Sequence, residues 1–515
     1  MAAILALLMG VSACGDDGGD SDTGAGPGSD AGVGSDTGDA GGDDGSGGDG
    51  GMPDGGAPSL AVVGSAVDVY TSDSGEVMLP HDLSETAIEA LVVDSDGSFT
   101  SYPAVGAADG SFALAEVPEG ATYYLHLSGD RERYIVTDAR ELDIGQRLVG
   151  RSDQQAATVS PTDLVFDVDG MSPWQEGDIL ELYSPGAGAA FSAVESRTDI
   201  AEDSTALTMA VDYTAGAELP MLIDSSLGDQ AFLIHLRGEQ SIEGIPYRGL
   251  AEICYADPFV QVDGESAVFR GSFAPIAERR QRTVDWRASQ FAQLAADGVP
   301  EMPFAYFNDV LGYVEVDPLG MYSSPLLYAI TAPDPNSDVL ATVEYGNPFP
   351  DEWGDYQWVR MYAYQLHELK EGFVFTVGGV SERGPLAGTG PIVPTLGPAR
   401  DLRLDGQDAK IELSEVGQTP ELSWEPPVLG MPDSYAVRIY RYEPSGGSVM
   451  RRINAATIVT TDTRVRVPPG VLTSGVPHYV RVSAVRHPGV PYLRQLFMNS
   501  VEYAFADTIS TLFVP

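Results

Sequence analysis

The chain has 515 residues, of which 43% are hydrophobic, and a formal net charge of −48. So acidic a protein repels phosphate backbones and anionic lipid headgroups, which argues against nucleic-acid binding and favours cationic or divalent partners. The length and the hydrophobic content suffice for about three packed domains.

The chain opens with an apolar run, Ala2 to Met9, which is followed by Val11-Ser12-Ala13 and Cys14. The run is too short to cross a bilayer, and small residues before a cleavage point suit a signal peptidase. Residues 1–14 resemble a bacterial lipoprotein signal peptide, and the resemblance implies that Cys14 carries the lipid that anchors the mature protein. Gly15 after the cysteine then favours the outer membrane or the cell surface over the inner membrane. The alternatives are an ordinary secretory signal cleaved after Ala13 and a chance apolar start.

Residues 15–58 contain 18 Gly and 11 Asp, and they lack Lys, Arg and Glu. Such a segment cannot form an apolar core, and its like charges repel one another, so we expect a disordered tether. A Gly-rich coil of this length spans about 35–40 Å. Calcium binding by the Asp-Gly steps is the alternative, although the regular Asp spacing and final Glu of a calcium loop are missing.

Residues 59–152 change to short apolar alternations separated by turn residues, which predicts strands. The strand candidates are Val67–Tyr70, Glu89–Val93, Ser111–Leu114 and Tyr123–Leu127. Asp96-Gly97 and Asp109-Gly110 suit tight turns between them. The run from Asp109 to Phe112, followed by Val117-Pro118-Glu119-Gly120, is similar to carboxypeptidase-regulatory-like sandwiches of the prealbumin type. The resemblance implies a small β-sandwich that serves as a non-catalytic spacer or interaction module.

Residues 153–394 resemble no family, and their pattern predicts a β-rich region of one domain or two. Its strand candidates are Asp163–Val168, Asp178–Tyr183, Ala206–Val211, Ala231–Leu236 and Phe373–Val377. One helix is expected, with Thr283 as its N-cap and Gly298 at its end. Cys254 lies in an apolar strand-like run, and we expect it to be a small core residue without a disulfide partner.

Residues 395–515 follow a Gly/Pro-rich hinge, Gly384 to Pro398. Three runs carry the clearest pattern of the chain: Leu422 to Pro427, Tyr435 to Tyr440 and Val480 to Val485. They resemble three strands of a fibronectin type III domain, which implies a sandwich with Trp424 in its core, acting as a spacer or binding scaffold. Leu472 and Gly475 match the residues that precede the family's corner tyrosine, but the corner position is His478. We expect this segment to fold on its own.

The sequence carries no recognised motif for catalysis. The sequence lacks the Gly-x-Ser-x-Gly elbow, the phosphate-binding loop with Gly-Lys and the dinucleotide-binding Gly-x-Gly-x-x-Gly after a strand. His367-Glu368 begins a zinc-protease pattern, but residue 371 is Glu, so the second imidazole is missing. We therefore assign no catalytic residue, no metal site and no cofactor.

The stretch from Tyr345 to Tyr364 is the most aromatic of the chain, and it carries the acidic residues Asp351, Glu352 and Asp355. As a strand it would place Tyr356, Trp358, Arg360, Tyr362 and Tyr364 on one face, and Gln357, Val359, Met361 and Ala363 on the other. The larger rings favour the aromatic face as core. In the alternative, the smaller set is core, and Trp353, Tyr356 and Trp358 form part of an exposed surface for a glycan or a protein partner.

Together these patterns predict an all-β protein of tandem β-sandwich domains behind a tether. The function they favour is that of a lipid-anchored envelope or surface protein with a binding, adhesive or structural role. The alternative is a surface hydrolase, directed at glycans or peptides, with its site in residues 153–394; carboxylates are too numerous to single out a pair.

Overall fold

The computed structural model describes residues 61–515 with short gaps. The gaps are residues 73–74, 129–131, 196–199, 215–219, 243–244, 301–305, 318–323, 331–337, 351–352, 371, 387–389, 412, 414, 445–448 and 495–501. The predicted signal peptide with Cys14 and the predicted tether, residues 15–58, lie outside the described residues.

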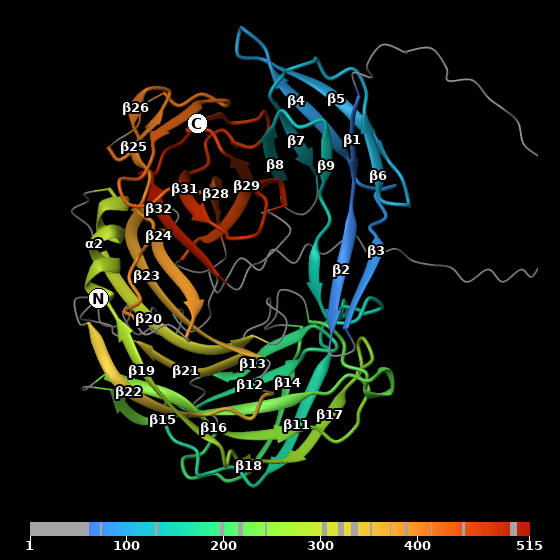
Figure 1. The fold of residues 1–515 in the computed structure, drawn as a ribbon, viewed down its shortest axis with the longest axis vertical. Coiled ribbons are helices and arrows are strands. Elements are labelled where there is room, and N and C mark those ends of the chain that lie inside the picture. Colours follow the sequence, from blue (N-terminus) through green and yellow to red (C-terminus); the bar gives the residue numbers. More distant parts are fainter. Residues whose placement is uncertain are drawn as a thin grey trace, which may run out of the picture.

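Strands dominate the described chain and follow a ring-like outline (Figure 1). We name four consecutive parts: the first segment (61–150), the second (151–278), the third (279–394) and the fourth (395–515). The prediction of an all-β fold is confirmed, because helix within the described residues is limited to α2 (Ala288–Gly298) and two 3-10 turns. Within the same residues, α2 and these turns are too short or too polar to span a bilayer.

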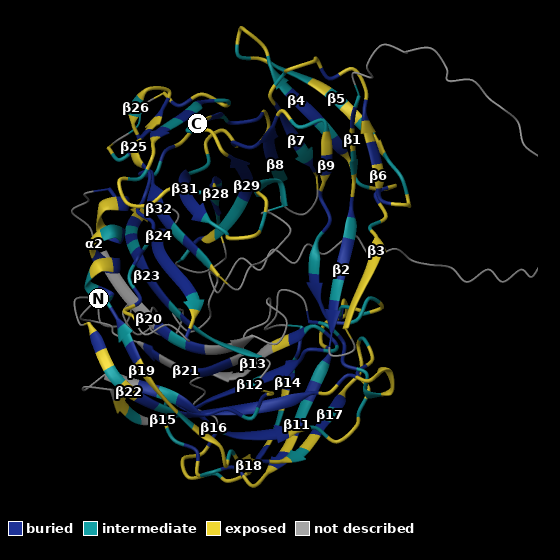
Figure 2. Cartoon of the chain, viewed as in Figure 1, coloured by how far each residue is buried: buried dark blue, intermediate teal, exposed yellow. Residues whose placement is uncertain are grey.

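The strands of the first segment are β1 (Val62–Ser65), β2 (Val67–Ser72), β3 (Gly75–Pro80), β4 (Ile88–Val93), β5 (Phe99–Gly106), β6 (Ser111–Leu114), β7 (Tyr123–Leu127), β8 (Glu132–Thr137), β9 (Glu141–Asp143) and β10 (Arg147–Val149). They pair in the order β9-β1-β6-β5-β4-β7-β8 around a core that includes Phe112, Tyr123 and Ile135. Gly97 and Gly110 have positive φ, as the predicted tight turns require. β10, β2 and β3 form a separate sheet, whose edge strand β3 is exposed along its length (Figure 2).

The strands of the second segment are β11 (Asp163–Asp169), β12 (Ile179–Ser184), β13 (Ala189–Glu195), β14 (Leu207–Asp212), β15 (Phe232–Ile242), β16 (Ile245–Tyr255), β17 (Ala267–Ser272) and β18 (Ala274–Pro275), with the 3-10 turn η1 (Ser225–Leu227). Two sheets, β14-β11-β17 and β13-β12-β15-β16, share a core that includes Phe166 and Leu233. Cys254 on β16 is completely buried in this core, as expected. Burial raises the pKa of its thiol to about 12, so the thiol is unreactive at neutral pH.

The strands of the third segment are β19 (Arg279–Trp286), β20 (Tyr306–Asp317), β21 (Ser324–Ile330), β22 (Val339–Gly346), β23 (Gly354–Leu369) and β24 (Gly372–Pro385). β21 pairs with β16, so β20, β21, β23 and β24 continue the sheet of the second segment. Helix α2 packs against β23 and β24 (Figure 1). The core here includes Trp286, Phe291 and Met361.

The predicted start of the helix is wrong. Thr283 to Trp286 belong to β19, which pairs with β22, and Arg287 occupies the N-cap position. Val284 and Trp286 are buried at alternate positions, which is the period of a strand. Over so few residues an apolar spacing fits a strand as well as a helix, and pairing with β22 decided between them. The helix ends at Gly298, as predicted.

The strands of the fourth segment are β25 (Arg400–Leu404), β26 (Gln407–Asp408), β27 (Glu421–Glu425), β28 (Ser434–Glu443), β29 (Arg451–Thr460), β30 (Arg464–Arg466), β31 (His478–Arg486) and β32 (Tyr503–Ile509), with the 3-10 turn η2 (Tyr492–Arg494). One sheet has the order β26-β25-β27-β30 and the other β32-β31-β28-β29. Trp424 lies in the core between them, edge-on to Tyr435 with ring centroids 5.2 Å apart.

His478 takes the place of the corner tyrosine in this sandwich. Its imidazole is completely buried; Nδ1 donates to the carbonyl of Val476 at 2.8 Å, and Nε2 accepts from the backbone N–H of Thr473 at 3.3 Å. Gly475 has a φ of 77°, which a residue with a side chain rarely adopts. The ring therefore ties down the chain before β31.

Both edges of the larger sheet in the fourth segment are paired with strands of other segments. β32 pairs with β24 of the third segment, and β29 pairs in parallel with β8 of the first. Hydrogen-bonded strands thus continue from the second segment through the third and fourth into the first.

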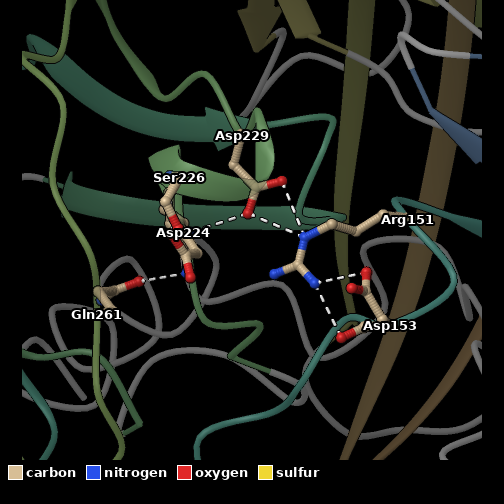
Figure 3. A network of polar contacts seen from close by, with 7 residues as sticks. Arg151, Asp153, Asp224, Ser226, Asp229 and Gln261 are labelled. Atoms are coloured by element: carbon tan, nitrogen blue, oxygen red, sulfur yellow. Dashed lines mark hydrogen bonds and ion pairs between the residues drawn. The ribbon is translucent and has the colours of Figure 1, made fainter.

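The start of the second segment is held by Arg151 (Figure 3). Its Nε lies 3.1 Å from Oδ1 of buried Asp229, and its Nη1 donates to Asp153. Oδ2 of Asp229 also accepts from the N–H of Asp224, at the start of η1. Strand pairs join the second segment to the third, the third to the fourth and the fourth to the first.

Candidate ligand-binding face

Strand β23 separates two kinds of side chain. Val359, Met361 and Ala363 are completely buried in the core of the third segment. Tyr356 and Trp358 on the opposite side are only partly buried. Tyr362 on the same side is buried, so the favoured expectation that the aromatic rings form the core holds for Tyr362 and fails for Tyr356 and Trp358. Helix α2 and the β19–β22 pair cover the side with the smaller residues.

Arg360 lies at the centre of the opposite side, surrounded by aromatic rings. Its Cζ is 3.9 Å from the ring centroid of Trp358, 4.9 Å from that of Tyr313 and 5.5 Å from that of Tyr362. Its Nη2 donates to the hydroxyl of Tyr313 at 2.7 Å. Tyr313 reaches it because β20 pairs with β23 in a register that places Tyr313 opposite Trp358. Each such cation–π contact contributes about 0.5–2 kcal/mol.

Trp358 is fixed by neighbours from two further strands. Its indole N–H donates to Oγ of Ser381 on β24 at 2.5 Å, and its ring meets Tyr503 of β32 edge-on, with centroids 5.7 Å apart. Arg383, opposite Trp358 on β24, lies 5.3 Å from the ring centroid of Tyr356 and 5.9 Å from that of Trp358. We call Tyr313, Tyr356, Trp358, Arg360, Tyr362, Arg383 and Tyr503 the aromatic–arginine face.

Arg360 is a buried cation, and some of its hydrogen-bond donors are unpaired. Its side chain is only 7% exposed, yet Nε and Nη1 have no hydrogen-bond partner. A buried donor left unpaired costs about 1–3 kcal/mol. The guanidinium is thus a desolvated positive charge with unused donors, in a protein whose formal net charge is −48.

Trp353, Tyr356 and Trp358, the three aromatic residues predicted to form a ligand surface, do not all lie on the same face. Tyr356 and Trp358 share the aromatic–arginine face, whereas Trp353 stacks on Phe349 of the core with centroids 5.0 Å apart. Of the expected acidic neighbours, Asp351 and Glu352 lie outside the described residues. Asp355 is on the core side, where it binds Arg280 at 2.9 Å. The charged residues of the face are Arg360 at its centre and Arg383 on β24, and the alternation of Tyr356, Trp358, Arg360 and Tyr362 along β23 was the signal available in the sequence.

A second polar cluster, in the second segment, is fully enclosed. His235 is completely buried; its Nε2 lies 3.0 Å from Asp178, its Nδ1 lies 3.2 Å from Glu252, and Trp174 stacks on its ring. Burial alone would lower the pKa of His235, but the two carboxylates outweigh it and raise the pKa. Burial likewise opposes ionisation of Asp178 and Glu252, yet the contacts with His235 lower the pKa of both. This cluster was not predicted from the sequence, since its members are far apart along the chain.

Metal ligands do not gather in the part of the chain that the structure describes, where no group of three His, Cys, Asp or Glu residues could hold an ion. His367 is buried on β23, and its Nε2 lies 3.0 Å from Oγ1 of Thr376. Burial lowers the pKa of His367 to about 4, so its ring is neutral at pH 7.

Comparison with known proteins places the chain in no family. No protein-family model matches it, and no curated protein does. Among solved structures, it is similar to the FN1–FN3 domains of chicken CNTN1, with a TM-score of 0.12 and 11% identity over 76% of this chain and 94% of that one. It is also similar to a tetra-tandem repeat from the extending region of a large adhesion protein, with a TM-score of 0.11 and 13% identity over 87% of this chain and 99% of that one. Both resemblances are weak, and no functional conclusion is drawn from them.

Proposed function

We propose that this protein binds glycans through the aromatic–arginine face while a lipid on Cys14 holds it at the bacterial cell envelope. The observation that carries the proposal is the pair of partly exposed rings, Tyr356 and Trp358, on the side of β23 away from the core. Sugar rings present C–H faces that pack on flat aromatic side chains, and their hydroxyls accept hydrogen bonds from guanidinium groups. A binding role of this kind needs no catalytic residue.

The frame around the face suits binding by preformed contacts. Ser381 holds the indole of Trp358, and Tyr313 holds the guanidinium of Arg360. These residues stand on paired strands, which hold side chains more precisely than loops do. The proposed tether, residues 15–58, would carry this frame about 35–40 Å from the membrane surface.

Affinity electrophoresis tests the proposal. The full chain in detergent is run through native gels that contain polygalacturonate, alginate, xylan or dextran. We expect at least one polysaccharide to retard the wild type and to retard Trp358→Ala much less, because loss of a stacking ring costs about 1–3 kcal/mol. Trp353→Ala is the matched control, since it removes an indole that packs on Phe349 outside the face.

Two results would reject the proposal. One is unchanged migration of the wild type in all four gels. The other is equal retardation of the wild type and a folded Trp358→Ala variant, which would move the binding site away from the aromatic–arginine face.

A further inference from the structure

We infer that the glycan is acidic and that Arg360 binds a carboxylate on its sugar rings. The inference rests on the proposed function and adds the charge of the ligand to it. It starts from the two unpaired nitrogens of Arg360, Nε and Nη1, in a side chain that is 93% buried.

Arg280, a second arginine of the third segment, has a carboxylate partner, which Arg360 lacks among the described residues. Arg280, on the core side, has the carboxylate of Asp355 at 2.9 Å from its Nη1. Arg360 on the opposite side of the sheet has a tyrosine hydroxyl and aromatic rings, and no carboxylate of the described residues pairs with it. The chain contains 76 acidic residues, so acceptors are abundant elsewhere. A carboxylate from outside the protein would supply the absent partner.

The surroundings of Arg360 favour an anion over a neutral acceptor. Arg383 on the adjacent strand adds a second positive charge, and the ring centroid of Trp358 lies 3.9 Å from Cζ of Arg360 and 5.9 Å from Cζ of Arg383. Charge-assisted hydrogen bonds are about twice as strong as neutral ones, and more so where water is excluded.

The partly exposed rings set the direction of approach. Tyr362 is buried, whereas Tyr356 and Trp358 are partly exposed. Because Nε and Nη1 of Arg360 are closed off from solvent in this structure, a sugar carboxylate would reach them by displacing the rings of Tyr356 and Trp358, against which the sugar ring would then pack. A uronic-acid polysaccharide combines these two features, an apolar ring face and a carboxylate, in each repeating unit.

The experiment compares polygalacturonate with its fully methyl-esterified form, which keeps the sugar ring and removes the charge. Calorimetric titration of the full chain in detergent at about 0.15 M salt should give an affinity for the acid about tenfold or more above that for the ester. This comparison uses only the wild type, so it holds whether or not any variant folds.

Variants then assign the preference to Arg360. Arg360→Gln should lose the preference for the acid while it retains binding of the ester, and Arg360→Lys should retain part of the preference. Arg270→Gln removes the same charge from an exposed site on β17 and should bind as the wild type does. Melting temperatures confirm folding, and Arg360→Lys alone suffices if Arg360→Gln does not fold.

The outcomes separate the two proposals. Equal affinity for acid and ester in the wild type overturns the acidic-ligand inference and leaves glycan binding in place. An undiminished preference in folded Arg360→Gln or Arg360→Lys also overturns the role of Arg360. Absence of binding to either form, and to the other polysaccharides, means that the proposed function itself fails.

Discussion

His235 is held by two carboxylates in the interior of the second segment, and its protonation state is linked to folding. The pKa of His235 is raised above its unfolded value of about 6.5, so the charged imidazole stabilises the fold below that pH. This contribution is lost as the pH rises through the folded pKa. The pKa values of Asp178 and Glu252 are lowered, so these carboxylates stabilise the fold above about pH 4. Their contribution to stability is lost as the pH falls through and below about 4.

His235→Gln tests this linkage. Removing one member of a buried charge cluster leaves the carboxylates unpaired and costs about 3–5 kcal/mol. Hydrogen exchange of peptides from β15 and β16, measured between about pH 5 and pH 9, reports on the second segment alone. We expect wild-type protection to decline at the alkaline end, and His235→Gln to be less protected at pH 6 and to show a flatter pH dependence. Identical profiles for the two proteins would show that His235 carries no charge in the fold.

At the scale of single elements, some features follow from local pattern and others do not. The Asp-Gly turns, the strand around Cys254 and the runs containing Trp424 and Tyr435 were predicted, because alternation and turn chemistry are local. The start of α2 was predicted wrongly, and the buried side of β23 was predicted correctly for Tyr362 only. In both places the outcome depends on a partner distant in sequence: β22 pairs with the residues before α2, and α2 itself covers the small residues of β23.

The candidate site was predicted in part for the same reason. Tyr356 and Trp358 lie two residues apart on one strand, so their shared side follows from strand geometry. Tyr313, Arg383 and Tyr503 join them only through the registers of β20, β24 and β32. The paired residues lie 45 positions apart for Tyr313 and Trp358, 25 for Trp358 and Arg383, and 120 for Arg383 and Tyr503, so no window of a few residues shows them together.

The fourth segment illustrates how an element can depend on its neighbours. Its sandwich has its own core around Trp424, but both edges of its larger sheet pair with other segments. Excision of residues 395–515 would expose β29 and β32 as unpaired edges, which favour association. The expectation from the sequence that residues 395–515 fold on their own stays a prediction, and the two edge pairings add that the isolated segment would associate.

We predict that isolated residues 395–515 self-associate and melt at a lower temperature than the same segment in the full chain. Sedimentation velocity measures the association, and hydrogen exchange of β28 and β31 compares stability in the two contexts. Trp424→Ala should lower the free energy of unfolding by about 3–5 kcal/mol in either context, and it shows how large a change in hydrogen-exchange protection such a loss produces. A monomeric fragment with the protection of the full chain would show that β24 and β8 contribute nothing to its stability.

At the scale of the whole molecule, successive contacts join all four segments. The second segment pairs with the third through β16 and β21. The fourth segment then reaches both the third and the first. Strand pairing between segments would hold the binding face in a fixed position. The proposed lipid at Cys14 would attach the protein to a membrane at one end.

Cys14→Ser tests the anchor separately from the fold. We predict that the variant leaves the detergent phase in phase partitioning and no longer incorporates labelled palmitate, because stable anchoring needs acyl chains. Its melting curve should match that of the wild type, since the change lies outside the described strands. Retention of Cys14→Ser in the detergent phase, with no label on the wild type, would contradict the proposed lipidation.

The most direct test of the binding face asks whether a glycan covers Trp358. Acrylamide quenching of tryptophan fluorescence is measured on the full chain with and without polygalacturonate, for the wild type and for Trp358→Phe. We predict that the polysaccharide reduces quenching in the wild type and has little effect in Trp358→Phe, because the partly exposed indole is the one that the ligand covers. Equal protection in both proteins, or none in either at saturating polysaccharide, would contradict the assignment of the aromatic–arginine face as the binding site.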